Sequence, residues 1–338
     1  MMFDGLADAS VASHAVDTKR VSRRAGGQRT VSSSSLLRQR TLKSTISCTG
    51  IGLHSGIKTR ITLAPAAPDT GIVFRRTDIA GSAAIIPANS DHVRDSRLCT
   101  VIGDNAGNTV ATIEHLMAAL VAMQVDNVEI QINGPEVPAM DGSAAPFVFL
   151  TECAGIVEQD APRRAIRVLK PVNVSAHGAE ASLHPGRGFS IDFTVDFPAA
   201  AIGRQSCSLD VTKTSFKAAL SRARTFCLIE DLPKMRDMGL ALGGSLDNAV
   251  VVNGADVLND GGLRYGNEFA RHKALDAIGD LALAGRPLLG HYSGLKSSHA
   301  LNTGLVKALL ADPSAWEEIT MTEEDLTPNR APLFAASA

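Results

Sequence analysis

The chain has 338 residues, of which 45% are hydrophobic and 20% are charged, and its formal net charge is −2. This length is sufficient for two domains with hydrophobic cores, and the nearly balanced charge argues against nucleic acid as the main partner. The five cysteines form no CxxC pair, which argues against a disulfide framework and is compatible with the reducing cytoplasm. We expect no membrane span, because no run of about 18 apolar residues is present.

Residues 1–36 differ in composition from the rest of the chain. They contain the basic, Ser-rich stretch "DTKRVSRRAGGQRTVSSSS", which is typical of a disordered extension. The following half, residues 37–160, begins with alternating patterns that predict strands at 40–47 and 58–65 around a Gly-rich turn. The further elements predicted in this half are strands at 70–78, 98–104 and 127–134 and helices at 112–123 and 145–156.

A similar order of predicted elements recurs in residues 161–334. The predicted elements of this half are strands at 164–176, 179–185, 189–197 and 287–297 and helices at 213–223, near 268–281 and at 298–312. A stretch rich in Gly and aliphatic residues, at about 226–256, is inserted between them. We therefore predict an α+β fold of two similar domains of layered sheet and helices, 37–160 and 161–334.

The helix at 112–123 is apolar on nearly all sides and should be buried. Glu114 and His115 are its only ionisable residues, and Thr112 is the expected N-cap, which places both in the first turn. A buried carboxylate is costly unless it is paired or binds a metal. The pattern favours a cleft at this helix end, although a hydrogen-bonded core histidine remains the alternative for His115.

The helix near 268, "EFARHKALDAIGDL", carries His272, Lys273, Asp276 and Asp280 within about 100° of arc. One interpretation is a solvated face with ion pairs between successive turns. The other is that His272 and Asp276, one turn apart, join His115 as metal ligands. Two nitrogens and one oxygen are the usual protein ligands of a catalytic zinc, and Glu114 could then accept a proton from water. The same ligand set suits non-haem Fe²⁺, so these residues do not identify the metal.

Seven motifs in order, from about residue 37 to 334, resemble the UDP-3-O-acyl-N-acetylglucosamine deacetylase family. They are "GIGLHSG", "TIEHLMAAL", "MDGSAAPF", "SRARTF", "LGGS", "EFARHKALDAIGDL" and "KSSHALN". The resemblance implies two βα domains, each with its own insert, and an active site between them. It also implies a Zn²⁺-dependent hydrolase that removes the N-acetyl group of UDP-3-O-[(3R)-hydroxyacyl]-N-acetylglucosamine, the committed step of lipid A biosynthesis in Gram-negative bacteria.

The resemblance further implies roles for individual positions. The implied metal ligands are His115, His272 and Asp276, the general base is Glu114, the proton donor is His299 oriented by Asp280, and the groups stabilising the oxyanion are Lys273 and Thr225. The implied substrate-contacting residues are His54, Leu98, Cys99, Phe226, Ile229, Ala241, Gly244, Ser245 and Lys296. The stretch 226–256 would form a hydrophobic passage for the acyl chain.

Other hypotheses remain open at this stage. A hydrolase with the same chemistry could act on another N-acetylated sugar, a binding protein could carry an inert site, and a structural protein could carry only a solvated polar stripe. The substrate partner that the resemblance implies is a small acylated UDP-sugar, and we expect a monomer.

Overall fold

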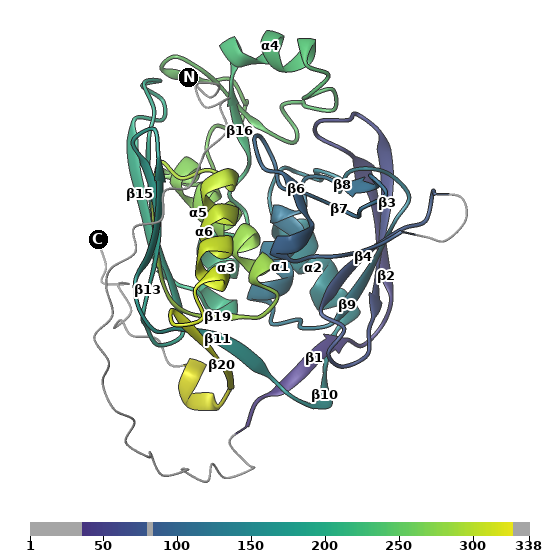
Figure 1. Cartoon of the computed structure of the whole chain (residues 1–338). Helices are drawn as coiled ribbons and strands as arrows, with labels where there is room; N and C mark the ends of the chain where they lie inside the picture. Colours follow the sequence, from purple (N-terminus) through teal and green to yellow (C-terminus); the bar gives the residue numbers. More distant parts are fainter. Residues whose placement is uncertain (1–35, 80–83, 327–338) are drawn as a thin grey trace.

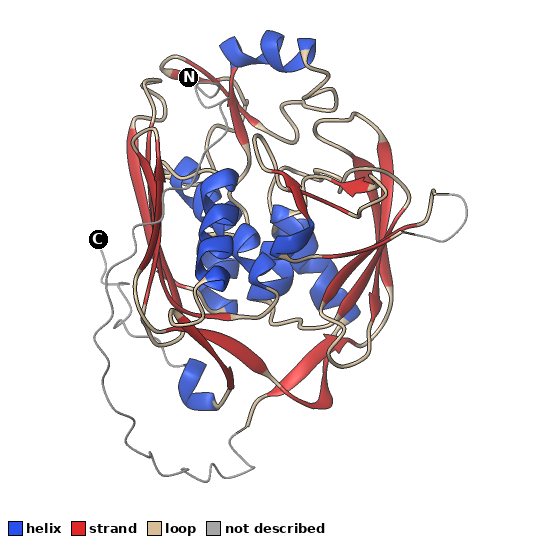
Figure 2. Ribbon diagram, viewed as in Figure 1, coloured by secondary structure: helices blue, strands red, loops and turns tan. Residues whose placement is uncertain are grey.

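The computed structural model describes residues 36–79 and 84–326. The predicted N-terminal extension lies outside the described residues except for Leu36, and so do residues 327–334 of the predicted second domain. Helices and strands are mixed along the chain, which confirms the predicted α+β class. Figures 1 and 2 show a layered molecule in which most helices lie between two β-sheets, one at each side.

The first half of the chain forms a five-stranded sheet. Its strands, in spatial order, are β2 (Ile46–Ile51), β3 (Lys58–Pro65), β9 (Val128–Ile132), β4 (Ile72–Arg76) and β5 (Ile85–Pro87). Neighbouring strands are antiparallel except β4 and β9, which are parallel. Side chains of β3 alternate between buried and more exposed positions, as expected for a strand with one face on a core.

Helix α2 (Ala145–Ala154) packs on β2, and helix α1 (Glu114–Ala122) packs on α2. A small antiparallel sheet consists of β6 (Val93–Asp95), β7 (Val101–Gly103) and β8 (Thr109–Val110).

The second half forms a seven-stranded sheet around one central strand, β19 (Leu288–Leu295). Strand β19 pairs antiparallel with β13 and parallel with β14 and β11. The other six strands are β11 (Arg164–Val168), β12 (Val172–Ala176), β13 (Ala179–His184), β14 (Phe189–Asp196), β15 (Arg204–Asp210) and β20 (Trp316–Thr320). Helices α3 (Lys213–Ala219), α5 (Glu268–Leu281) and α6 (His299–Ala311) belong to this half. Within residues 36–79 and 84–326, no helix has the length and apolar character needed to cross a membrane.

The predicted insert is a βαβ unit at the top of Figure 1. Strand β16 (Phe226–Leu228) leads through helix α4 (Leu232–Asp237) to β17 (Val250–Asn253), which pairs parallel with β16 and antiparallel with β18 (Asp256–Val257). The unit therefore projects from the end of the helical layer rather than extending the large sheet.

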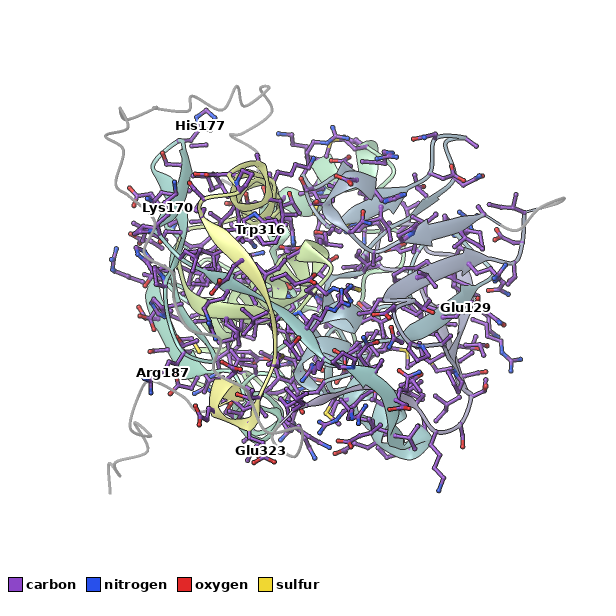
Figure 3. The ribbon with its side chains drawn as sticks, turned by 60° about the horizontal axis from the view of Figure 1, so that its bottom comes forward. Glu129, Lys170, His177, Arg187, Trp316 and Glu323 are labelled. Atoms are coloured by element: carbon purple, nitrogen blue, oxygen red, sulfur yellow. The ribbon has the colours of Figure 1, made fainter. Side chains whose placement is uncertain are left out.

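A two-stranded ribbon lies at the opposite end of the molecule. Strand β1 (Arg38–Leu42) pairs antiparallel with β10 (Ile156–Pro162), and the Leu37 N–H donates to Met321 O at 3.0 Å. Figure 3, with this end turned forward, places Glu129 of β9 on one side and Lys170 and Trp316 on the other. The start of the described chain is thus tied to the second half.

The observed strands differ from the predicted ones in several places. The strand predicted at 40–47 is interrupted by a bend after Leu42, so that β1 and β2 enter different sheets. The strand predicted at 164–176 is likewise divided into β11 and β12, which are not neighbours in the sheet. Among the strands that were not predicted, β15 and β20 were missed because each has few apolar residues and an exposed outer face. A sheet that already has a strong core needs little apolar patterning from such peripheral strands.

The two halves meet where α1 packs against α5. A Cβ built at Gly279 of α5 would lie only 2.0 Å from the carbonyl oxygen of Glu114, so this contact requires glycine. The close approach places the first turn of α1 beside the middle of α5. Because both segments carry ionisable residues, this contact determines the geometry of the site described next.

Candidate active site

The polar stripe of α5 is buried. His272 and Asp276 are 2% and 3% exposed, and Asp280 is fully buried. The interpretation of this stripe as a solvated face is therefore wrong. The cause is the opposing helix α1, which covers the stripe with its own first turn, where Glu114 and His115 are also buried.

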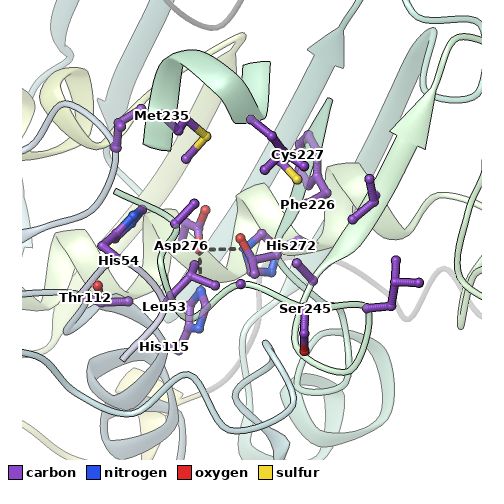
Figure 4. A pocket seen from close by; sticks show the side chains of 18 of the residues that line it. Leu53, His54, Thr112, His115, Phe226, Cys227, Met235, Ser245, His272 and Asp276 are labelled. Carbon is purple, nitrogen blue, oxygen red and sulfur yellow. Dashed lines mark ion pairs between the residues drawn. The ribbon is translucent and has the colours of Figure 1, made fainter. Parts of the chain in front are cut away.

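His115, His272 and Asp276 converge on one point between the helices (Figure 4). Asp276 Oδ1 lies 3.3 Å from His115 Nε2 and 3.2 Å from His272 Nε2. This oxygen is buried and accepts no hydrogen bond from the described residues. An unpartnered buried carboxylate oxygen facing two imidazole nitrogens fits a divalent metal, because such a group is otherwise costly to bury.

The protonation states of His272 and Asp276 also fit a metal. Burial lowers the pKa of His272 to about 4, which keeps its ring neutral. His272 Nδ1 lies 3.0 Å from the carbonyl oxygen of Ala223, so Nδ1 carries the hydrogen and Nε2 presents its lone pair to the cluster. Burial opposes the charge of Asp276, but His272 and Lys273 outweigh burial and hold the pKa of this carboxyl well below its usual value. The cluster therefore offers a neutral imidazole nitrogen from His272 and a carboxylate from Asp276, with His115 Nε2 facing both.

Glu114 lies at the first position of α1, next to His115 in sequence. One carboxylate oxygen, Oε2, accepts a hydrogen bond from the Thr100 N–H at 3.1 Å, and the other, Oε1, lies 3.9 Å from His299 Nε2. Burial raises the pKa of Glu114, which makes this carboxylate a better proton acceptor than an exposed one. The predicted N-cap role of Thr112 is wrong: Ile113 is the N-cap and provides no side-chain cap.

His299 lies at the first position of α6 and is held by Asp280. Its Nδ1 is 2.9 Å from Asp280 Oδ2, which also accepts a hydrogen bond from Asn302 Nδ2 at 2.9 Å. Asp280 Oδ1 accepts from the Thr100 hydroxyl. Burial opposes protonation of His299, but Asp280 outweighs burial and raises the pKa of the imidazole to about 9. The protonated Nε2 points toward Glu114 and Asp276, each at 3.9 Å.

Lys273 adds a positive charge beside the cluster. Its Nζ donates to Asp276 Oδ2 at 2.9 Å. Burial opposes this charge, but Asp276 outweighs burial and raises the pKa of Lys273, so the amine is protonated. Lys273 and Thr225 both line the cavity in front of the cluster, which is where negative charge on a reacting carbonyl would need stabilisation.

The cluster opens into an apolar cavity of about 320 Å³ that extends under the βαβ insert. The predicted substrate positions that line it are His54, Leu98, Phe226, Ile229, Ala241, Gly244 and Ser245. Lys296 is exposed and Cys99 is buried, and neither lines the cavity. Lining residues outside the predicted substrate positions are Leu53, Thr112, Cys227, Leu232, Met235, Arg236, Leu246, Ala249, Val251 and Leu258. Most are aliphatic and carry no chemical signature of their own, so only the fold could identify them.

A buried ion pair supports the segment in front of His272. The Arg224 guanidinium donates to both carboxylate oxygens of Glu268, from Nε at 2.9 Å and from Nη2 at 3.1 Å, and the Arg224 N–H donates to Glu268 at 3.0 Å. Glu268 begins α5, and Arg224 lies between Ala223 and Thr225. The pair therefore fixes both the carbonyl that orients His272 and the position of Thr225.

These features define a class of protein. A buried His₂Asp ligand set lies beside a carboxylate with a raised pKa and a histidine held in its protonated form, at the mouth of an apolar cavity. This arrangement on an α+β fold is that of a metal-dependent hydrolase.

Comparison with known proteins identifies the family. Residues 39–311 match the family LpxC, UDP-3-O-acyl N-acetylglycosamine deacetylase. The UDP-3-O-acyl-N-acetylglucosamine deacetylase of Acidithiobacillus ferrooxidans is 52% identical over 290 residues, which cover 85% of this chain and 95% of that protein. The enzymes of the same name from Chromohalobacter salexigens and Myxococcus xanthus are 49% and 48% identical, covering 90% and 85% of this chain and 99% and 91% of those proteins. The chain belongs to the UDP-3-O-acyl-N-acetylglucosamine deacetylase family.

Proposed function

We propose that this protein hydrolyses the N-acetyl group of UDP-3-O-acyl-N-acetylglucosamine, releasing acetate and UDP-3-O-acyl-glucosamine, in lipid A biosynthesis. Membership of the deacetylase family, supported by the match over residues 39–311, gives the reaction and the substrate. The observation that carries the proposal in the structure is the buried His115, His272 and Asp276 cluster at the mouth of an apolar cavity. An amide-hydrolysing centre next to an acyl-sized cavity suits an acylated, N-acetylated substrate.

The metal that we propose for this cluster is Zn²⁺, held by His115 Nε2, His272 Nε2 and Asp276 Oδ1. Catalytic zinc is typically held by two imidazoles and one carboxylate. A hydrogen bond from the second ring nitrogen to a backbone carbonyl, as His272 Nδ1 makes here, is also typical. When bound, the ion supplies Lewis-acid activation of water and of the amide carbonyl. Fe²⁺ accepts the same ligands and is the alternative outcome of a metal analysis.

We propose that Glu114 is the general base. Its raised pKa and its place beside the ligand cluster suit removal of a proton from the attacking water. The Thr100 N–H holds one oxygen of Glu114, which leaves the other free to face the reacting centre. Lys273 and Thr225, on the cavity wall, would stabilise the oxyanion of the tetrahedral intermediate.

The proton donor in this proposal is His299. An amine is a poor leaving group until it is protonated, and Asp280 keeps the imidazole of His299 in its charged form. The imidazolium would give its Nε2 proton to the leaving amine. Because Nε2 faces Glu114 at 3.9 Å, the proton that Glu114 took from water could then pass to the neutral imidazole and restore both groups. Glu114 and His299 thereby divide base and acid roles between two groups with opposite charges.

The acyl chain would lie in the apolar cavity under the insert, between β16, α4 and the loop that contains Ala241 and Gly244. We also propose that residues 37–160 and 161–334 act as two domains with the site between them. His54, Glu114 and His115 would come from the first domain, and Thr225, His272, Asp276 and His299 from the second. None of these assignments needs a second copy of the chain, which is consistent with a monomer.

Release of acetate from three compounds tests the proposal. The purified protein should deacetylate UDP-3-O-(3-hydroxytetradecanoyl)-N-acetylglucosamine, and it should act far more slowly on UDP-N-acetylglucosamine, which lacks the acyl chain. Free N-acetylglucosamine serves as the control for a general deacetylase. Equal rates on all three would contradict the proposed substrate while leaving the hydrolytic chemistry intact.

A further inference from the structure

A buried carboxylate outside the cavity joins two segments that carry site residues. Glu136 is 1% exposed and does not line the cavity. Its carboxylate accepts hydrogen bonds from the backbone N–H groups of His54 and Ser55, at 2.9 and 2.7 Å, and from the Thr112 hydroxyl at 2.8 Å. No cationic side chain among the described residues forms an ion pair with it in the structure, so three neutral donors satisfy its charge.

The first of these segments is the turn at 52–55. A Cβ at Gly52 would lie 2.4 Å from Glu136 Oε2, so the carboxylate occupies the space that any other residue at 52 would fill. The same turn accepts hydrogen bonds from the insert: Leu242 N–H donates to His54 O and Gly243 N–H to Leu53 O, both at 3.1 Å. The turn therefore places the His54 side chain on the cavity wall and anchors the loop of the insert.

The second segment leads into the general base. Thr112 is buried and has a φ of 57°, a left-handed conformation that is rare for a β-branched residue. Two residues later, Glu114 begins α1. A conformation of this kind persists only where the surroundings hold it, and the hydrogen bond from the Thr112 hydroxyl to Glu136 is one contact that does so.

We infer that Glu136 is a positioning residue for the deacetylation reaction, acting through Thr112 on Glu114 and through the 52–55 turn on His54 and the insert loop. This inference rests on the proposed role of Glu114 as base. A displacement of about 1 Å of a catalytic group can lower the rate roughly 100-fold. Loss of the hydrogen bond between Thr112 and Glu136 should therefore lower kcat. Disruption of the 52–55 turn should weaken substrate binding and raise KM.

The variants T112V and E136Q separate the two routes. T112V removes the hydroxyl and keeps the branched shape, so we expect kcat to fall roughly 10- to 100-fold with KM and metal content unchanged. T112S retains the hydroxyl and should recover most of that loss. E136Q loses at least one of its three hydrogen bonds, because its amide nitrogen cannot accept, and should lower kcat and also raise KM. G52A, whose methyl group would meet the carboxylate, should reproduce the effect of E136Q.

Coupling between the positions provides the decisive readout. If Glu136 acts through Thr112, the kcat of the double variant T112V/E136Q should be no lower than that of the poorer single variant. Effects on kcat that multiply, or variants with lowered melting temperature and wild-type kcat, would overturn the inference and leave Glu136 a purely structural residue. An inactive wild-type protein would instead contradict the proposed function, so the two failures are distinguishable. T112V and T112S keep the test valid if E136Q does not fold.

Discussion

Replacing Gly244 by methionine tests whether the apolar cavity holds the acyl chain. Gly244 lines the cavity, and a Cβ at this position would meet no atom closer than 3.4 Å, so the backbone can accept a side chain. Ala241 also lines the cavity, but its φ of 55° makes a bulky replacement strained. Gly244 is therefore the better position for reducing the space without disturbing the fold.

The expected effect follows from the space that the new side chain occupies. Methionine adds four heavy atoms, which would displace about four methylenes of an acyl chain from a cavity of about 320 Å³. At about 0.8 kcal/mol for each buried CH₂, the loss is about 3 kcal/mol, or roughly 200-fold in affinity. A substrate whose acyl chain does not reach Gly244 should lose little.

Steady-state kinetics with two substrates, one with a 14-carbon and one with a 4-carbon 3-hydroxyacyl group, measures the difference. KM for the long substrate should rise strongly in G244M, KM for the short substrate should change little, and metal content should equal that of wild type. The matched control is G261M, because Gly261 is exposed, has no atom within 4 Å of its Cβ position and does not line the cavity. An equal change with both substrates, or no change with either, would refute the assignment of the cavity to the acyl chain.

Three further predictions concern catalysis, stability and the N-terminus. E114A and H299A should retain the metal but lose roughly 10²–10⁴ in kcat, the usual size of a general acid or base effect, and an unchanged rate in H299A would place the proton donor elsewhere. Burial opposes the charge of Glu268, but hydrogen bonds from Arg224 and from the backbone N–H groups of Arg264 and Arg224 outweigh burial and hold its pKa below the usual value. The stabilisation from this carboxylate is therefore complete above its unfolded-state pKa and is lost as the pH falls through its lower folded-state pKa. Thermal melts of E268Q should show a loss of about 3–5 kcal/mol near neutral pH and a smaller difference from wild type in acid, and equal stability at pH 7 would contradict the role of the pair. A chain that begins at Leu37 should match the full chain in turnover and melting temperature, and a large loss in either would mean that residues 1–36 contribute to the fold or the site.

Local sequence patterns predicted the helices and strands better than they predicted how these elements pack together. The helix that begins at Glu114 follows from a long apolar run, the one at Glu268 from its separate polar and apolar faces, and α6 in part from a serine cap at Ser298. The sequence left open whether the polar stripe of α5 is solvated or meets His115 of α1. That contact depends on one glycine, Gly279, whose role becomes visible only when both helices are placed.

The same difference between local patterns and distant contacts applies to the residues of the candidate active site. Residues with a chemical signature, such as His115 and Asp276, could be proposed from sequence because few structures tolerate them in an apolar helix or on a crowded face. Thr112 was misinterpreted as a cap, because its residue type fits that role and nothing in the local sequence reveals a positive φ or a partner at Glu136. Contacts between residues distant in sequence carry no local signal. The sequence therefore predicted the reacting residues but not the residues that support them.

Anomalous X-ray diffraction from crystals of the wild-type protein at the zinc absorption edge tests the central claim most directly, which is that His115, His272 and Asp276 hold one catalytic metal. The claim predicts a single strong peak per chain, about 2.0–2.2 Å from His115 Nε2, His272 Nε2 and Asp276 Oδ1. The peak should disappear in H272A crystals grown and measured in the same way. A peak bound to other residues, or one that persists unchanged in H272A, would contradict the claim.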